Sequence, residues 1–243
     1  MSSTHASVGI LIIGSLYWDD ETTREKWRQK RLDLNKTTCI SAPIRYGRRS
    51  RSRGCSYTMV FSEQLNRDPA RLGTAIVVPC KRPASSIEDL MDEAEWLWAA
   101  ENKSKKSTRV ISREWGRVVI KTNPNREIPK EFLQGWNTTV SKNNSCGLMK
   151  HACDEVPIVN EAGILNIDWP SKQDGNALDL DILLATATDP TIGADRQYPN
   201  AKEIADAWKN ENGRCYGNYF WCNKKHNITT FQDVEIQQYL SDK

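Results

Sequence analysis

The sequence lacks a long apolar run and a strong excess of charge of either sign. No apolar stretch approaches the roughly 20 residues that cross a bilayer, and the first residues lack the basic, apolar and small-residue regions of a signal peptide. Lys and Arg number 34 against 31 Asp and Glu, which gives a net charge of +3. This balance excludes a polycation that binds nucleic acid or membrane with its whole surface. We expect a soluble cytoplasmic protein without a membrane partner, in which any preference for anions is local.

The seven cysteines also lack a regular spacing. Their odd number argues against the disulfide framework of a secreted protein. Thiol and imidazole groups that can bind zinc do occur together in two places, at Cys146, His151 and Cys153 and at Cys215, Cys222 and His226. Neither spacing matches a common zinc finger, so we interpret the cysteines as unpaired, partly buried thiols. A zinc site is the alternative.

The order of the expected elements lacks the regular strand–helix alternation of a doubly wound sheet. Strand-like runs alternate irregularly with two helix patterns, at 19–34 and 87–102. We therefore predict an α+β fold with a mixed, partly closed sheet or barrel and flanking helices. Residues 1–122 form the expected core, and residues 123–243 form an additional segment that packs on this core or completes it.

The additional segment is less regular than the core. Residues 123–173 are polar and rich in loop-forming residues, whereas 177–189 fit either a strand or a buried helix. Residues 198–211 have the spacing of an amphipathic helix. Four aromatic residues lie in or after this helix pattern: Trp208, Tyr219, Phe220 and Trp221. We expect them to pack in the core, and the alternative is a surface patch that binds a partner protein.

The stretch "VGILIIGSLYWDD", residues 8–20, begins as a buried strand and continues into Gly14-Ser15-Leu16 before a helix pattern. Glycine permits a close approach of the backbone to a ligand. Consecutive amide N–H groups at a turn that leads into a helix form a site for a carboxylate or a developing oxyanion. The alternative is a plain strand-to-helix turn in which Ser15 caps the helix.

The helix pattern at 87–102 places Glu101 where an apolar residue is expected. Ile87, Ala94 and Glu101 are spaced by seven residues and share the apolar stripe, whereas Glu93 and Glu95 fall off it. A carboxylate at the edge of an apolar environment can accept and return a proton near neutral pH. The alternative is a helix end from which Glu101 reaches solvent or pairs with a nearby lysine, Lys103 or Lys105.

Together these features resemble the γ-glutamylcyclotransferase-like family, which has a Tyr-Gly-Ser-Leu or Tyr-Gly-Ser-Asn turn after the first strand and a later glutamate. The turn reads Ile13-Gly14-Ser15-Leu16 here and continues into Tyr17-Trp18. Three later segments are similar to family segments in the same order: "APIRYGRRSRSRG", "RLGTAIVVP" and "EDLMDEAEWLWAAE". The resemblance covers residues 8–122. One residue departs from the family pattern: Ile13 stands where the family has a tyrosine before the glycine. The phenol of that tyrosine is therefore absent unless Tyr17 supplies one.

The resemblance implies an amide-cleaving, cyclising acyltransferase or lyase. The free α-amine of a γ-glutamyl amine or peptide attacks its own γ-carbonyl, which forms 5-oxoproline and releases the amine or amino acid. Glu101 would be the general acid and base, and the turn residues Gly14, Ser15 and Leu16 would bind the small substrate together with Tyr17. Neither a metal nor an organic cofactor is implied.

An arginine cluster, "RYGRRSRSR", provides a second hypothesis. Strand alternation can direct Arg45 inward, to the carboxylate of a small substrate. The other guanidinium groups suit a phosphorylated ligand or RNA, so a non-catalytic binding module is the alternative function: Arg48, Arg49, Arg51 and Arg53. A solvated loop would explain the same charge run.

Overall fold

The structure is a computed structural model that describes residues 5–50, 56–108, 110–142, 148–151, 154–191, 197–209 and 217–241. Its strands are β1 (Val8–Ile12), β2 (Thr38–Ala42), β3 (Ile44–Ser50), β4 (Ser56–Phe61), β5 (Gly73–Pro79), β6 (Ser112–Arg113), β7 (Gly116–Thr122) and β8 (Ile182–Thr188). Its α-helices are α1 (Thr22–Arg31), α2 (Ile87–Asn102), α3 (Lys130–Lys142), α4 (Ala201–Lys209), α5 (Gly217–Lys225) and α6 (Asp233–Ser241). Short 3-10 helices occupy Leu34–Lys36, Glu63–Arg67 and Pro69–Arg71.

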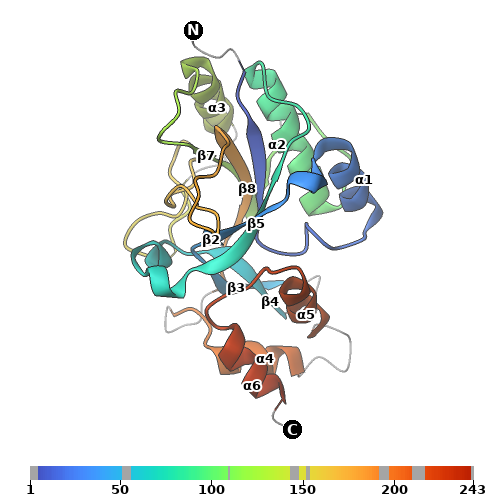
Figure 1. The fold of residues 1–243 in the computed structure, drawn as a ribbon, viewed down its shortest axis with the longest axis vertical. Coiled ribbons are helices and arrows are strands. Elements are labelled where there is room, and N and C mark those ends of the chain that lie inside the picture. The colour runs from blue at the N-terminus through green and yellow to red at the C-terminus, as the bar shows by residue number, and fades with distance from the viewer. Residues whose placement is uncertain are drawn as a thin grey trace.

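Six strands form one mixed sheet in the order β2-β5-β1-β8-β7-β6, and β3 and β4 form a separate hairpin (Figure 1). β1 runs parallel to β8 and antiparallel to β5. The α+β class with flanking helices is confirmed. The expected closure into a barrel is wrong, because β2 and β6 end the described sheet and do not pair with each other.

β8 lies in the middle of this sheet although it belongs to the segment after residue 122. All five residues of β1 are buried, as are the first six residues of β8, so both strands are covered on both faces. Residues 177–189, whose sequence fits either a strand or a buried helix, therefore contain a strand. Residues 123–243 supply a central element of the sheet that the N-terminal half begins.

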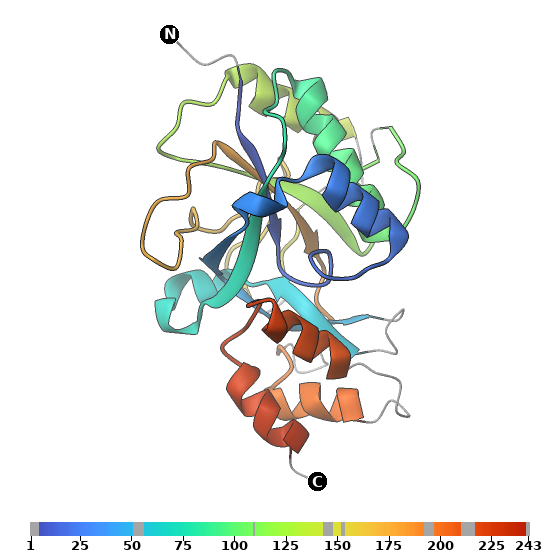
Figure 2. The same cartoon turned by 45° about the vertical axis from the view of Figure 1, so that its right-hand side comes forward.

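Helices α1 and α2 lie side by side beside the sheet, and α3 packs against α2 (Figures 1 and 2). The α2 bounds coincide with the predicted pattern. The expectation that 123–173 is loop-rich is wrong for α3, because Phe132, Trp136 and Val140 recur every four residues and are buried along one face. In the described part of the chain, no helix combines the length and apolar character needed to cross a membrane.

Glu93 and Glu95 are buried on α2, contrary to the prediction that they lie off its buried side. Their exposed fractions are 6% and 5%. Arg31 of α1 pairs with Glu93 at 2.7 Å, and Lys106 pairs with Glu95 at 3.0 Å. Ion pairs between neighbouring elements allow carboxylates to be buried at positions that an apolar pattern cannot identify.

The three C-terminal helices lie below the β3–β4 hairpin, at the end of the molecule opposite the N-terminus (Figure 2). Trp208, Tyr219 and Phe220 are buried there, with Tyr46 of β3 in edge contact with the first two rings. Core packing is thus confirmed for three of the four aromatic residues. Trp221 is 46% exposed.

Asp233, the first residue of α6, is buried with one carboxylate oxygen lacking a partner among the described residues. The Thr230 amide and hydroxyl both donate to its Oδ1, at 3.0 and 2.6 Å. Burial raises the pKa of Asp233 from 3.8 to about 6. The folded state therefore binds more protons than the unfolded state between these values, and stability falls as pH rises through this window.

We expect Asp233→Asn to raise the free energy of unfolding at pH 7.5 by up to about 3 kcal/mol, because it removes a buried charge and keeps an acceptor for Thr230. The gain should shrink towards zero at pH 4, where Asp233 is mostly protonated in the folded state. Urea denaturation of both proteins at the two pH values measures the difference. A variant less stable than the wild type at pH 7.5 would contradict this account.

Candidate functional site

A cavity of about 780 Å³ lies between the six-stranded sheet and the β3–β4 hairpin. β1 and β8 are parallel, so their carboxyl ends meet at one edge of the sheet, beside the start of antiparallel β7. Residues after β1 and β8 and before β7 form the upper wall, and β3, β4 and Tyr219 form the lower one. The volume is in the range of small-molecule sites.

The segment after β1 folds into a compact turn at this cavity. The Tyr17 amide donates to the Gly14 carbonyl at 3.2 Å and the Asp19 amide to the Ser15 carbonyl at 2.9 Å. Both donor amides belong to residues after Leu16, not to Gly14, Ser15 or Leu16. Gly14, Ser15 and Leu16 are buried and all three line the cavity, where the sequence predicted a ligand-binding turn.

Two arginines of α1 fix this turn from one side. Arg28 donates to the Leu16 carbonyl at 2.7 Å and to the Asp19 carbonyl at 2.8 Å. Arg24, 3% exposed, donates to Ser15 Oγ at 2.9 Å and pairs with the Asp19 carboxylate at 2.7 Å. The turn thus has a defined shape that does not depend on a ligand.

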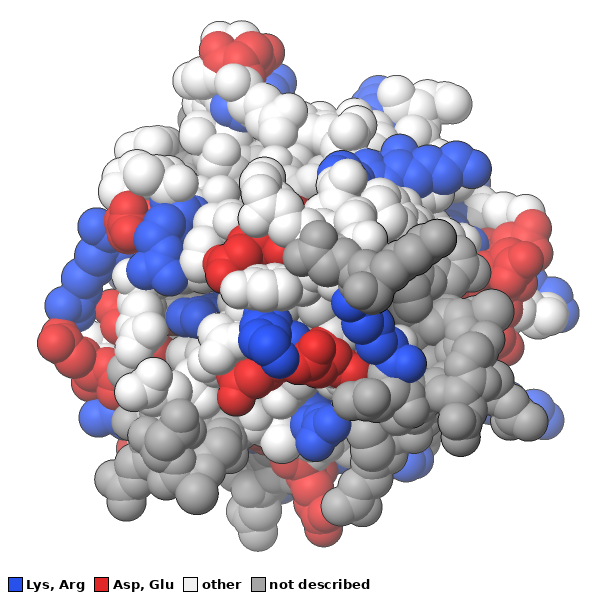
Figure 3. Space-filling model, turned by 90° about the horizontal axis from the view of Figure 1, so that it is seen from below, with Lys and Arg blue, Asp and Glu red and all other residues white. Residues whose placement is uncertain are grey.

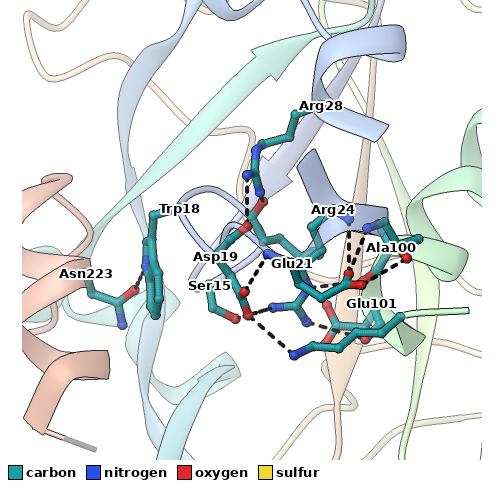
Figure 4. A network of polar contacts seen from close by, with 12 residues as sticks. Ser15, Trp18, Asp19, Glu21, Arg24, Arg28, Ala100, Glu101 and Asn223 are labelled. Atoms are coloured by element: carbon teal, nitrogen blue, oxygen red, sulfur yellow. Dashed lines mark hydrogen bonds and ion pairs between the residues drawn. The ribbon is translucent and has the colours of Figure 1, made fainter. Parts of the chain in front are cut away.

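Arg24 also binds the end of α2. Its Nε donates to the Ala100 carbonyl at 3.1 Å and its second terminal nitrogen to the Glu101 carbonyl at 3.4 Å. Figure 4 shows the guanidinium between Ser15 and Asp19 on one side and Ala100 and Glu101 on the other. One side chain therefore fixes the turn relative to the helix end that presents Glu101.

Glu101 is half-buried and lines the cavity. Within the described residues, its carboxylate forms no ion pair or hydrogen bond, and Lys103 lies 3.6 Å from Asp19 instead. The ion pair of Glu101 with Lys103 or Lys105 that the alternative predicts is therefore not formed. Glu101 is in the last turn of α2, where the helix dipole favours cations, so its position there has no evident structural benefit.

Tyr219 of α5 places a phenol against Gly14. A Cβ atom on Gly14 would lie 2.5 Å from the Tyr219 hydroxyl oxygen, a distance that only glycine avoids. The Met59 amide donates to the same oxygen at 3.5 Å, and Tyr219 lines the cavity. The phenol beside the glycine comes from residue 219 rather than from residue 13 or Tyr17.

This contact predicts a specific coupling between two substitutions. We expect Gly14→Ala to lower the free energy of unfolding by about 1–3 kcal/mol through overpacking against the phenol. Tyr219→Phe removes the clashing oxygen, so the double variant should be more stable than the sum of the two single effects predicts. Urea denaturation of the four proteins tests this, and strict additivity would contradict the contact.

Two other predicted binding residues do not line the cavity. The Tyr17 ring meets that of His226, the residue after α5, edge-on at 5.4 Å. Arg45 is buried with its guanidinium carbon 4.1 Å from the Tyr198 ring centre. The neighbouring turn residue Trp18 donates to Asn223 Oδ1 at 2.7 Å, so side chains of this turn also anchor it to α5 (Figure 4).

The arginine cluster divides in the structure. Arg48 and Arg49 line the cavity, Arg45 is buried elsewhere, and Arg51 and Arg53 lie outside the described residues. On the face that bears the C-terminal helices, the described basic and acidic side chains are interspersed (Figure 3). Among the described residues, this face therefore shows no separated region of positive charge of the kind that binds a polyanion.

The zinc hypothesis receives no support from the described residues, which contain no group of three His, Cys, Asp or Glu side chains suited to a metal. Cys146, Cys153 and Cys215 lie outside the described residues. His151 is buried and contacts the Tyr198 hydroxyl at 2.7 Å. Cys39 and Cys80 are free thiols, as predicted.

The resemblance to the γ-glutamylcyclotransferase-like family thus depends on a short turn, the order of later segments and Glu101. The turn and Glu101 lie at one cavity, whereas Tyr17 and Arg45 lie outside it. Comparisons of the chain with protein-family models, with curated proteins and with solved structures found no match.

Proposed function

We propose that this protein is a γ-glutamylcyclotransferase-like enzyme that releases 5-oxoproline from a small γ-glutamyl compound. The observation that supports the proposal is the common cavity of the Gly14–Leu16 turn and the Glu101 carboxylate. Arg24 fixes the two relative to each other, because its two terminal nitrogens donate to Ser15 Oγ and to the Glu101 carbonyl. A reaction within one folded substrate depends strongly on such positioning.

In the proposed reaction, the α-nitrogen of the γ-glutamyl group forms a bond to its own γ-carbonyl carbon. The α-ammonium first releases one proton to solvent. Glu101 accepts the second proton, which the attacking nitrogen loses, and the negative charge develops on the carbonyl oxygen near the turn amides. The amide C–N bond then breaks as Glu101 returns a proton to the leaving nitrogen. The products are 5-oxoproline and an amine, and no water is consumed.

The charges of the cavity suit a zwitterionic substrate. The lining includes the acidic residues Glu101, Glu114 and Asp189, and it includes four basic residues: Arg24, Arg48, Arg49 and Lys103. A γ-glutamyl group presents an ammonium and a carboxylate on one carbon, so a cavity with both signs of charge complements it. Arg24 and Lys103 contact Asp19, and Arg48 and Arg49 of β3 add positive charge to the lower wall.

Mass-spectrometric detection of 5-oxoproline tests the proposal. The purified full chain is incubated with γ-glutamyl dipeptides and γ-glutamyl alkylamides, and we expect 5-oxoproline and free amine in equal amounts. Release of glutamate in place of 5-oxoproline would indicate hydrolysis. No product from any of these compounds would refute the proposed function.

A non-catalytic binding module is the second candidate, because Arg48 and Arg49 line the same cavity. Binding of single-stranded RNA through phosphates should weaken linearly with the logarithm of salt concentration. We would measure that slope if no γ-glutamyl compound reacts. Affinity independent of salt would exclude phosphate-backbone binding.

A further inference from the structure

Four buried polar atoms have no hydrogen-bond partner among the described residues in the region where the C-terminal helices meet the β3–β4 hairpin. They come from four different elements: Tyr46 Oη of β3, Trp208 Nε1 of α4, Asn223 Nδ2 of α5 and Asp233 Oδ2 of α6. None of these residues is more than 6% exposed. Folded proteins leave few buried polar atoms unpaired, because each loses its hydration without compensation. Four in one region therefore indicate a binding site for a small polar molecule.

The Tyr46 hydroxyl lies at the centre of this group. Gln232 Oε1 accepts from the Tyr46 amide at 3.2 Å, which places the neighbouring Asp233 beside β3, and the Trp208 ring meets the Tyr46 ring edge-on at 5.2 Å. Burial raises the pKa of Tyr46 well above its usual value; the Asp233 carboxylate adds to this rise and the Asn223 amide opposes it. Both groups therefore face the hydroxyl, although none of the three unpaired atoms forms a hydrogen bond with another.

The contacts that these side chains already make determine what each still needs. Asn223 Oδ1 accepts from Trp18 Nε1 at 2.7 Å, and an indole nitrogen can only donate, so the other end of the amide is Nδ2 and needs an acceptor. Asp233 Oδ1 accepts from the amide and the hydroxyl of Thr230, whereas its Oδ2 still needs a donor. The Tyr46 hydroxyl can donate or accept.

The mixture of donors and acceptors selects the bound molecule. The Asp233 carboxylate would repel an anion, and the Asn223 N–H group would face a cation with its positive end. A neutral molecule that both donates and accepts satisfies all three atoms. Water accepts from Asn223, donates to Asp233 and bonds to Tyr46 in either direction, and buried waters typically form about three such bonds.

We propose that Tyr46, Asn223 and Asp233 bind one buried water molecule between the hairpin and the C-terminal helices. None of the three residues lines the cavity, so this site is separate from the candidate active site and does not depend on the proposed function. The water fixes the orientation of the Asn223 amide. It thereby supports the bond to Trp18 that anchors the cavity turn to α5.

The test is a nuclear Overhauser measurement between water and side-chain amide protons in the isotope-labelled full chain. At pH 7.5 the Asp233 carboxyl, whose pKa is about 6, is mostly ionised, so its own proton does not contribute. We expect a cross-peak between water and the Asn223 amide protons. Gln232 is the matched control, because its amide is also buried but donates to the Pro199 carbonyl at 3.1 Å. It should show no water cross-peak.

Tyr46→Phe distinguishes a bound water from exchange of the phenol proton with solvent, which gives a similar cross-peak. We expect the Asn223 cross-peak to remain in this variant, since two partners still hold the water. Thermal unfolding verifies that the variant is folded. If it does not fold, a crystal structure of the wild-type chain takes its place and should show an ordered water about 2.7–3.2 Å from all three atoms.

Three results would overturn the inference. The first is a wild-type protein without a water cross-peak at the Asn223 amide, and the second is loss of that cross-peak in folded Tyr46→Phe. The third is a crystal structure in which Asn223 Nδ2 donates directly to Asp233 Oδ2 or to the Tyr46 hydroxyl oxygen. Each of these results leaves the proposed function unaffected.

Discussion

Replacing Glu101 with Gln should reduce kcat for 5-oxoproline release by about 10²- to 10⁴-fold, the usual contribution of a general acid or base. The amide has nearly the same shape but cannot accept the proton of the attacking nitrogen. KM should change little, because the proposed substrate contacts are with the turn and the hairpin. Initial rates measured by mass spectrometry over a range of substrate concentrations give both parameters.

Stability should barely change in Glu101→Gln, because the carboxylate has no ion pair or hydrogen bond among the described residues. The substitution also removes a negative charge from a helix C-terminus, where it is unfavourable. Glu88→Gln is the control, since Glu88 is exposed in the first turn of the same helix. A Glu101→Gln enzyme with more than half of the wild-type kcat would exclude Glu101 as the acid and base.

Local patterns in the sequence were sufficient for the elements that bring the turn and Glu101 together. β1 is a continuous apolar run, and α2 has an apolar stripe bounded by Ser86, whose side chain accepts from the Asp89 amide. The stripe also identified Glu101 as the position that interrupts it. These features depend on neighbours within a few turns of the chain, which is why periodicity detects them.

Features that depend on distant parts of the chain were missed. Tyr219 meets Gly14 across 205 positions, and no local pattern relates an aromatic residue in α5 to a turn after β1. The open sheet is a similar case, because the central place of β8 follows from long-range pairing. The phenol beside Gly14 comes from another element, and only the fold reveals which one.

The burial of two arginines on α1 was not predicted, although the sequence offered a usable signal. Arg24, Trp27 and Arg28 are buried together at spacings of three and four residues, yet basic residues on a helix are normally assigned to its solvated face. Arginine is suited to burial where several carbonyl oxygens converge, because its planar group donates five N–H bonds. Two arginines flanking a tryptophan at this spacing, next to a Gly-Ser turn, would have suggested such a role.

Arg24→Met is expected to have the largest effect on stability, a loss of about 3 kcal/mol in the free energy of unfolding. The guanidinium is 3% exposed and contacts the Ser15 hydroxyl, the Asp19 carboxylate and two carbonyls at the end of α2. Methionine fills a similar volume but leaves these acceptors unpaired. We expect the lower end of the usual range for broken buried pairs, because Asp19 is partly exposed and keeps Lys103 as a neighbour.

The same variant should lower kcat by about 100-fold in the fraction that remains folded, since it frees the turn and Glu101 to move apart. Arg24→Lys keeps the charge near Asp19 but cannot bridge to both carbonyls, so it should recover stability more than activity. Lys26→Met, on the exposed side of α1, controls for the loss of a positive charge from this helix. Urea denaturation and initial rates are measured for all three variants. If Arg24→Lys restored stability and kcat to the same degree, Arg24 would act only by stabilising the fold. The relative placement of the turn and Glu101 would then not require the several N–H donors of the guanidinium.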